Sequence, residues 1–207
     1  MPDDSLQTVA AEVRVCPLCE LSRTRTNAVP GDGADKARIL LIGEGPGWNE
    51  DKQGLPFVGA AGKFLDELLG IAGLSRPDVF ITNVVKCRPP GNRDPMPDEI
   101  AACAPYLDRQ IALIDPEVVV TLGRFSMARW FPGERISKIH GTPKRDGKRL
   151  IVPMYHPAAA LHQQALRGLI EADFAKLPAI LADAETFLAE APPANVADPA
   201  SEQMKLF

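Results

Sequence analysis

The chain has 207 residues, of which 45% are hydrophobic and 24% are charged, and its formal net charge at pH 7 is −4. This length and apolar content suit a single globular domain with a substantial core. The sequence has no run of about 18 apolar residues and no apolar segment after its acidic start, so we expect neither a membrane span nor a secretory signal. It therefore predicts a cytoplasmic protein, whose four cysteines are not expected to pair as disulfides.

Charge is distributed unevenly along the chain. Residues 124–149 contain eight basic and two acidic residues, whereas residues 168–207 contain seven acidic residues and two lysines. Phosphate binding depends on the local potential, so a basic face could bind nucleic acid in spite of the negative net charge. An ordinary solvated surface is the alternative interpretation of the same charges.

Hydrophobic periodicity predicts helices and strands in alternation. Ser5 is placed to cap a helix with apolar residues at helical spacing over residues 6–13. An Asp-Gly pair within residues 144–149 indicates a hairpin. The further strands are expected at 39–42, 79–85, 118–123 and 150–155, and the further helices over 60–72, 98–114 and 166–188, the last with an interruption before Pro178.

This alternation indicates the α/β class. We expect one three-layer αβα domain over residues 1–188, with a central, mostly parallel, four-stranded sheet. Residues 189–207 contain few core-forming side chains over most of their length, so they are expected to form a disordered tail.

A glycine-rich loop follows the first parallel strand. Residues 43–47 read Gly-Glu-Gly-Pro-Gly, and a second turn bounded by Gly54 and Gly59 carries Phe57. Glycines let the backbone approach a ligand closely, and ligands of open α/β sheets bind at the carboxyl ends of the strands. A phosphate-binding loop is disfavoured, because the glycine spacing differs from Gly-x-Gly-x-x-Gly and no Gly-Lys-Ser/Thr follows.

All four cysteines fall into two pairs, Cys16-x2-Cys19 and Cys87-x15-Cys103. Four thiolates suit a structural zinc ion or an iron–sulfur cluster. Free cysteines are also common as small apolar residues of a core. The spacing alone does not distinguish a cluster, a zinc ion and unliganded thiols.

Two segments together resemble the catalytic motifs of the uracil-DNA glycosylase superfamily. Residues 43–59, GEGPGWNEDKQGLPFVG, resemble its first motif in the form typical of family 4, the iron–sulfur type, and residues 156–161, HPAAAL, resemble its second motif. The resemblance covers roughly residues 14–182. It implies a DNA-repair enzyme that flips uracil out of DNA, hydrolyses its N-glycosidic bond and leaves an abasic site. It also implies a structural [4Fe–4S] cluster at Cys16, Cys19, Cys87 and Cys103.

The chemistry of uracil excision gives these motifs their expected roles. The flipped base needs a snug pocket, in which Phe57 offers an aromatic face while Gly43 and Gly45 bind the substrate through the backbone. A carboxamide matches the N3–H donor and O4 acceptor of uracil but not the reversed pattern of cytosine, and the resemblance implies this role for Asn83. Negative charge develops on uracil O2 as the bond breaks, so a fixed donor there, His156, lowers the barrier.

The chain departs from the first family of the superfamily at two positions. Gly45 replaces the aspartate that orients the attacking water there, which leaves Glu44 as the nearest candidate for a catalytic carboxylate. Gly47 replaces the bulky aromatic residue that excludes thymine, so this exclusion is expected from Glu50 or the adjacent loop. A highly dissociative transition state demands little of the water, in which case no side-chain base is needed.

The expected DNA contacts lie outside the pocket. Leu161 or Ala160 would fill the hole left by the flipped base, and Arg88 in the proline-rich loop would contact phosphates together with the basic segment 124–149. The protein is expected to act on uracil-containing DNA as a monomer. At the end of the chain, the sequence resembles the bacterial sliding-clamp-binding peptide Gln-x-x-Leu-Phe, here with Gln203, Leu206 and Phe207.

Three alternatives stay open. Residues 135–141, RISKIHG, partly resemble the loop of a family 4 relative that bonds covalently to the DNA sugar through a histidine, here His140, although that relative carries a longer basic insertion. A non-catalytic iron–sulfur or zinc protein could bind nucleic acid with the same fold. A small-molecule hydrolase or nucleotide-binding enzyme could also use such a sheet.

Overall fold

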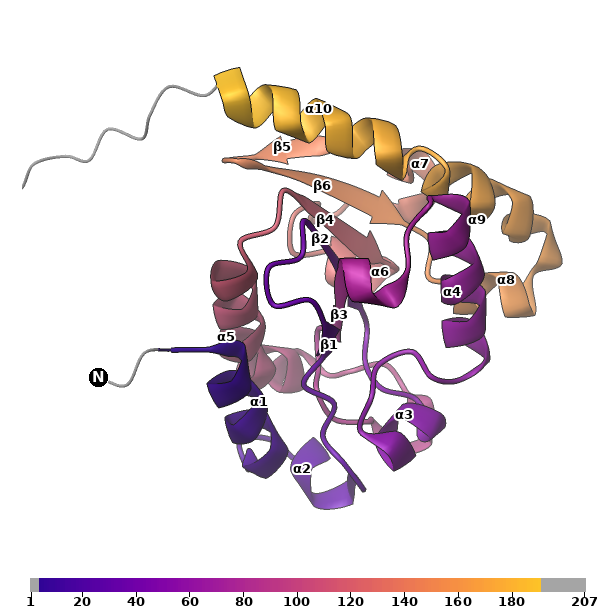
Figure 1. The fold of residues 1–207 in the computed structure, drawn as a ribbon. Helices are drawn as coiled ribbons and strands as arrows, with labels where there is room; N and C mark the ends of the chain where they lie inside the picture. Colours follow the sequence, from indigo (N-terminus) through magenta and orange to yellow (C-terminus); the bar gives the residue numbers. More distant parts are fainter. Residues whose placement is uncertain (1–3, 191–207) are drawn as a thin grey trace, which may run out of the picture.

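The computed structural model describes residues 4–190 and contains one central sheet (Figure 1). The strand order is β1-β3-β2-β4-β6-β5. The four inner strands run parallel to one another, and the two short edge strands pair antiparallel with their neighbours. The strands are β1 (Asp32–Gly33), β2 (Ile39–Gly43), β3 (Val79–Asn83), β4 (Val118–Leu122), β5 (Lys144–Asp146) and β6 (Arg149–Met154).

The predicted α/β class and mostly parallel sheet are confirmed, but the sheet has six strands within residues 4–190 instead of four. The four parallel strands are the four that the apolar runs predict. β5 is the first strand of the hairpin indicated by the Asp-Gly pair. β1 is only two residues long and lies in a segment without a periodic pattern, which is why the sequence does not predict it.

Helices cover both faces of the sheet and complete the three layers. One face packs against α4, α8, α9 and α10, and the other against α1, α5 and α6. Every residue of β2, β3 and β4 is buried, which explains their continuous apolar runs, because a strand covered on both faces has no solvent side. The helices are α1 (Leu6–Val15), α2 (Leu21–Thr24), α3 (Trp48–Gln53), α4 (Ala60–Ile71), α5 (Pro97–Ile114), α6 (Arg124–Met127), α7 (Ile136–Ile139), α8 (Ala158–His162), α9 (Arg167–Phe174) and α10 (Leu177–Glu190).

The longer predicted helices are confirmed. Oγ of Ser5 caps α1 by accepting a hydrogen bond from the backbone N–H of Thr8 at 3.1 Å, and α9 and α10 are separated just before Pro178. Periodicity does not predict α3 and α8, because these helices are short and directly follow Gly47 and Pro157. None of the helices within residues 4–190 is long and apolar enough to cross a membrane.

The last helix of the described residues is α10. It continues to Glu190, two residues past the helix end that the sequence predicts at residue 188. The remainder of the predicted tail, with its possible clamp-binding peptide, lies outside the described residues.

Candidate active site

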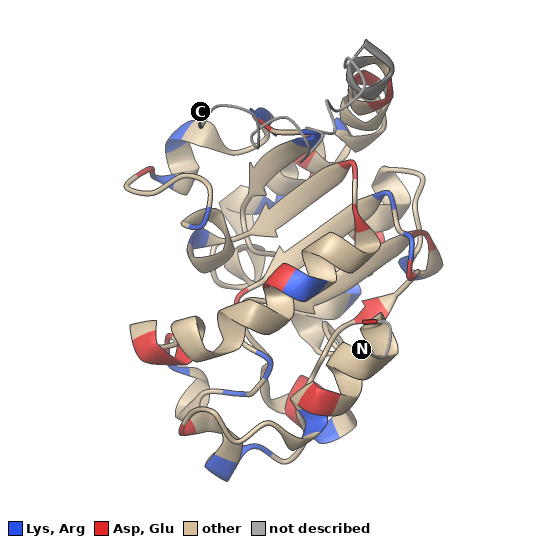
Figure 2. Cartoon of the chain, turned by 90° about the vertical axis from the view of Figure 1, so that its left-hand side faces the viewer, with Lys and Arg blue, Asp and Glu red and all other residues tan. Residues whose placement is uncertain are grey.

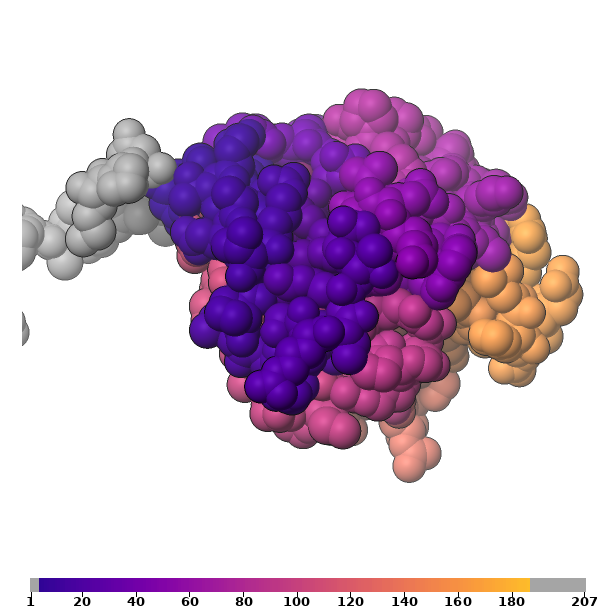
Figure 3. All heavy atoms as spheres, turned by 90° about the horizontal axis from the view of Figure 1, so that it is seen from below, coloured from indigo at the N-terminus to yellow at the C-terminus, as the bar shows by residue number. Residues whose placement is uncertain are grey.

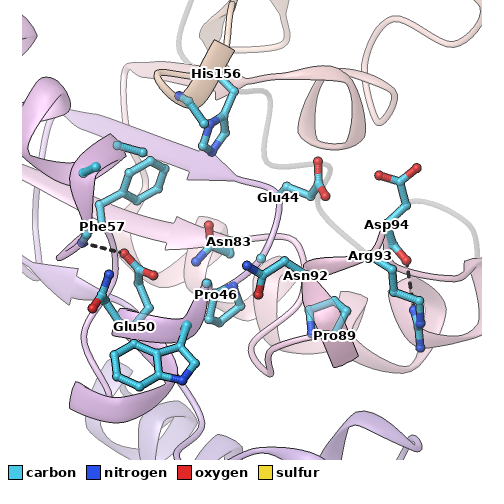
Figure 4. A pocket seen from close by; sticks show the side chains of 18 of the residues that line it. Glu44, Pro46, Glu50, Phe57, Asn83, Pro89, Asn92, Arg93, Asp94 and His156 are labelled. Carbon is cyan, nitrogen blue, oxygen red and sulfur yellow. Dashed lines mark hydrogen bonds between the residues drawn. The ribbon is translucent and has the colours of Figure 1, made fainter. Parts of the chain in front are cut away.

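The carboxyl ends of the parallel strands meet at one edge of the sheet, as their common direction requires. In the pairing of β2 with β3, Gly43 lies directly opposite Asn83, and His156 follows the last residue of β6 by two positions. This edge contains a cavity of about 660 Å³. The side chains of Glu44, Phe57, Asn83 and His156 line it and converge on the same space (Figure 4).

Close packing of the cavity wall explains the first two glycines of the loop. A Cβ atom on Gly43 would lie 2.3 Å from Oδ1 of Asn83 and 2.8 Å from the ring of Phe57. A Cβ atom on Gly45 would lie 2.8 Å from a methyl group of Val85. A larger residue at Gly43 would therefore displace two of the side chains that form the cavity.

The carboxamide of Asn83 is buried and incompletely bonded. Only 1% of the residue is exposed, and its Oδ1 has no hydrogen-bond partner within the described residues. An unpaired buried acceptor costs about 1–3 kcal/mol, and native proteins retain few such atoms. A ligand with an N–H group would recover this free energy, so the orphaned oxygen points to a binding function.

Phe57 has an unusual backbone conformation, with φ of +52°. The guanidinium of Arg76 donates hydrogen bonds to the carbonyl oxygens of Pro56, at 3.0 Å, and of Phe57. Gly62 packs against the same turn, since a Cβ atom there would lie 1.8 Å from the carbonyl oxygen of Phe57. Positive φ is costly for a bulky residue unless its surroundings enforce it, so these contacts hold the aromatic ring at the cavity.

Glu50 of α3 fixes the chain just after Phe57. Its Oε1 accepts hydrogen bonds from the backbone N–H groups of Val58 and Gly59, both at 2.9 Å. Glu50 also lines the cavity. Its expected part in excluding thymine stays a prediction, while its part in shaping the turn is visible in these contacts.

The ring of His156 is held in one orientation and one tautomer. It stacks on Phe57 with the ring centroids 5.4 Å apart and the planes at 24°. The backbone N–H of Ala158 donates to Nδ1 at 3.1 Å, so the proton of the neutral ring is on Nε2. Desolvation lowers the pKa of His156 to about 4, although Glu50 acts in the opposite direction. At neutral pH, His156 is therefore an uncharged donor.

Glu44 brings a carboxyl group into the cavity from the glycine-rich loop, and its side chain is half-buried. Burial raises the pKa of this carboxyl, Asp94 raises it further, and Arg124 lowers it. Asp94 and Arg124 form an ion pair with each other. A carboxyl in this place can orient a water molecule or stabilise a developing positive charge.

The four cysteines line a second, smaller cavity on the face covered by α1 and α5. Seen from below, the N-terminal residues lie against residues from the middle of the chain (Figure 3), which is how the first cysteine pair reaches the second. No group of three or more His, Cys, Asp or Glu side chains within residues 4–190 is placed to hold a single metal ion. All four cysteines nevertheless line the same cavity.

Burial disfavours the thiolate forms of Cys87 and Cys103, whereas hydrogen-bond donors beside these two sulfur atoms favour them. Burial raises the pKa of Cys103 to about 11, Lys86 opposes the rise, and the neighbouring thiols Cys87 and Cys19 add to it. Nη1 of Arg25 donates to Sγ of Cys87 at 3.1 Å, and the backbone N–H of Lys86 donates to Sγ of Cys103 at 3.3 Å. Bound iron or zinc would keep such thiols deprotonated, so the donor set fits a metal centre.

The structure separates the two candidate wedge residues on α8. Leu161 is 51% exposed, whereas Ala160 is 5% exposed and belongs to the core. Arg88 is half-buried, and its Nε donates to Oδ1 of Asn92 at 2.6 Å. Leu161 is therefore the one of the two that a DNA strand can reach.

The basic segment 124–149 does not form one uninterrupted face. Lys148 and Arg149 both pair with Asp115, and Arg129 pairs with Asp108. Asp115 precedes β4 and Arg149 begins β6, so the two pairs of Asp115 lie at the amino ends of the strands, away from the cavity. Acidic and basic residues are interspersed in Figure 2.

His140 is not among the described residues that line the cavity. Its Nδ1 lies 2.6 Å from Oδ2 of Asp173, a side chain with 2% exposure, and its ring centroid lies 5.2 Å from that of Tyr155. These contacts tie the end of α7 to α9.

Sequence reasoning misses several further residues of the cavity. They come from α3 and from the loop after β3, neither of which has a periodic pattern, and Trp48 among them is 55% exposed. In the sequence, the proline-rich composition of residues 89–97 indicates a loop after β3, and this loop forms a second wall of the cavity. The additional lining residues include Trp48, Asn49, Pro89, Asn92 and Arg93.

Comparison with known proteins shows the family of the chain that forms this cavity. A family model described as "Uracil DNA glycosylase superfamily" matches residues 30–181, which include every residue named above for the larger cavity. The chain belongs to the uracil DNA glycosylase superfamily. The family that the two motifs indicate is thus confirmed, while Cys16 and Cys19 lie outside the matched range.

Several relatives are similar over most of the chain. The type-4 uracil-DNA glycosylase of Sulfurisphaera tokodaii is 55% identical and the match covers 84% of each chain. That of Saccharolobus solfataricus is 53% identical over 84% of this chain and 85% of its own. The type-5 uracil-DNA glycosylase of Thermus thermophilus is 40% identical, but over only 48% of this chain and 52% of its own.

The low pKa of His156 predicts a pH-dependent contribution to stability. Because the folded-state pKa of about 4 lies below the ordinary value of 6.5, the unfolded chain binds a proton more readily between these values. The contribution is therefore fully present above about pH 6.5 and is lost as the pH falls toward 4, by at most about 1.4 kcal/mol per pH unit. Denaturant unfolding of wild type and His156→Gln at several pH values would measure it as the difference between the two proteins. A difference that does not change with pH would contradict the neutral, desolvated state of His156.

Proposed function

We propose that the protein hydrolyses the N-glycosidic bond between uracil and deoxyribose in DNA, which releases uracil and leaves an abasic site. The unpaired, buried Oδ1 of Asn83 carries this proposal, because Asn83 lines a cavity that is also lined by the uncharged donor His156. Membership of the superfamily and the type-4 relatives at 42–55% identity support the same activity.

Asn83 selects the base. Its Oδ1 accepts the N3–H of uracil, and its Nδ2 donates to O4 of the same edge. Cytosine presents an acceptor at N3 and a donor at C4, so both contacts would be mismatched and a buried polar group would stay unpaired. Such a mismatch costs a site of this kind several orders of magnitude in specificity.

His156 stabilises the leaving group. As the bond between C1′ and N1 breaks, its electron pair passes to uracil and negative charge accumulates on O2. Nε2–H of His156 donates to that oxygen from a ring fixed by Phe57 and Ala158. A preorganised donor in a desolvated site stabilises the transition state more than the ground state.

Glu44 acts at the sugar. The carboxylate of Glu44 stabilises the positive charge of the sugar and orients a water molecule that attacks C1′. Glu44 accepts the proton of this water, and the departing uracil anion takes up a proton, so that the products are neutral uracil and the abasic sugar. The half-buried position of Glu44 strengthens both interactions, since charges interact more strongly where water is excluded. Leu161, exposed on α8, enters the space that the flipped base leaves in the duplex, and Arg88 contacts a phosphate nearby.

The cysteine centre holds a [4Fe–4S] cluster with a structural role. All four cysteines line one cavity, and four thiolates are the usual ligand set of such a cluster. The type-4 relatives support the choice of a cluster over a zinc ion, because the sequence resemblance to that family is to its iron–sulfur form. Bound there, it would tie the N-terminal segment to the loop after β3 and to α5.

The setting of the reaction follows from the substrate. The enzyme is proposed to act as a monomer. Uracil in the DNA of the cytoplasmic nucleoid is the proposed substrate. The terminal Gln203, Leu206 and Phe207 would bind a sliding clamp and raise the local concentration of the enzyme at replicating DNA.

A gel assay tests the activity. An oligonucleotide with a single uracil should break only after hot alkali, and His156→Ala should lower the excision rate by about 100–1,000-fold, the usual loss for one such donor. Gly43→Ala should cause a comparable loss by displacing Asn83 and Phe57. Gly70→Ala is the matched control, because a Cβ there meets nothing within 4 Å.

Two outcomes of this assay would contradict the mechanism. Undiminished excision by His156→Ala would remove His156 from the reaction. A heat-stable protein–DNA band would show covalent capture and shift the chemistry to His140.

Anaerobic purification tests the cluster. The protein should be brown and contain iron and acid-labile sulfide, and Cys103→Ala should lose the colour while His156→Ala keeps it. Metal analysis that finds zinc in a colourless protein would replace the cluster with a zinc site.

A pull-down on immobilised bacterial sliding clamp tests the terminal peptide. The full chain should be retained, and a chain ending at Glu202 should pass through with its excision activity unchanged. Equal retention of both chains would rule out the peptide as the clamp ligand.

A further inference from the structure

Lys86 is the largest of the fully buried side chains within the described residues, with 1% of its surface exposed. Burying an ammonium group is costly unless hydrogen bonds compensate it, and an apolar side chain of similar length would fill the same space at no such cost. The uracil-excising residues described above do not include Lys86. Its burial therefore calls for a specific function.

Three neutral acceptors surround the ammonium group. Nζ donates to Oγ1 of Thr82 at 2.6 Å, to the carbonyl oxygen of Asn83 at 2.7 Å and to Oε1 of Gln110 at 2.7 Å. These contacts use the three donors of an ammonium group in full. Two of the acceptors belong to the last two residues of β3, and the third belongs to α5.

The same network reaches the segment before β1. Nε2 of Gln110 donates to the carbonyl oxygen of Pro30 at 2.6 Å, and Oγ1 of Thr82 donates to it at 3.0 Å. The backbone carbonyl of Lys86 accepts from the N–H of Val29 at 2.7 Å. Lys86 thus joins the end of β3, α5 and residues 29–30 around one buried point.

Asn83 depends on this network for its orientation. Its side-chain oxygen has no partner of its own within the described residues, so the backbone must aim the carboxamide. On the β2 side, the N–H of Val84 donates to the carbonyl of Gly43 at 3.0 Å. The carbonyl of Asn83 itself is held by Lys86.

We propose that Lys86 is a positioning residue that fixes the end of β3 and thereby aims the carboxamide of Asn83 at the flipped base. The inference rests on the proposed function, since it assigns Asn83 to uracil. A misplacement of the carboxamide by about 1 Å is enough to lower a rate by about 100-fold. The effect should fall on catalysis and leave binding of DNA without uracil unchanged, because Lys86 is remote from solvent.

Two variants separate positioning from stability. Lys86→Met keeps the length of the side chain but leaves three buried acceptors without their donor, so it should lower both the melting temperature and the excision rate. In Lys86→Met with Gln110→Leu, one of those acceptors is also removed, and the carbonyl of Pro30 keeps its hydrogen bond from Thr82. Because replacing both partners of a buried hydrogen bond can be nearly neutral for stability, the double variant should regain part of the melting temperature and keep a kcat for uracil excision that is about 10–100-fold below wild type.

The readouts are kcat and KM on a uracil oligonucleotide, the melting temperature, the visible absorption of the cysteine centre, and the affinity for an oligonucleotide without uracil. Recovery of kcat in step with the melting temperature would overturn the proposal and leave Lys86 a purely structural role. A wild-type protein that does not excise uracil would instead mean that the proposed function has failed. If Lys86→Met alone does not fold, the double variant still decides between the two roles.

Discussion

The pairing of β2 with β3 is the constraint on which the site depends. It sets Gly43 opposite Asn83, and it continues beyond the strands, where the N–H of Val85 donates to the carbonyl of Glu44 at 3.1 Å. The glycine-rich loop and Asn83 are therefore held by one ladder of hydrogen bonds. A slip of one residue would turn the side chain of Asn83 to the other face of the sheet, so under the proposed function the register also determines the specificity.

Desolvation gives the cavity its chemistry. It keeps His156 neutral, and the hydrogen bond from Ala158 then directs the remaining proton to Nε2. A neutral ring avoids the cost of a buried imidazolium, and in the proposed mechanism it still donates a hydrogen bond when negative charge develops on the leaving group. Burial also acts on Glu44, whose charged form is negative. It therefore raises the pKa of this carboxyl above that of an exposed glutamate.

The sequence predicts those parts of the fold and site that depend on local pattern. The parallel strands are continuous apolar runs in the sequence. Gly43, Asn83 and His156 can be predicted as site residues because they lie at strand ends or in a glycine-rich turn. It does not predict α3 and α8, which are too short to show a period. Nor does it reveal Arg76, because its bonds to the turn at Phe57 join residues 19 and 20 positions apart, and no spacing rule reaches so far.

The cysteine centre and the cavity are connected through five residues. Asn83 ends β3 and lines the larger cavity. Lys86 donates back to the carbonyl of Asn83 through Nζ and forward to Sγ of Cys103 through its backbone N–H, and Cys87 lines the cysteine centre. Residues 84–87 have no regular structure that could fix them by itself. In the proposed enzyme, the structural cluster therefore influences catalysis through residues 83–87. It anchors this segment at Cys87, and the other end of the segment is Asn83, which binds uracil.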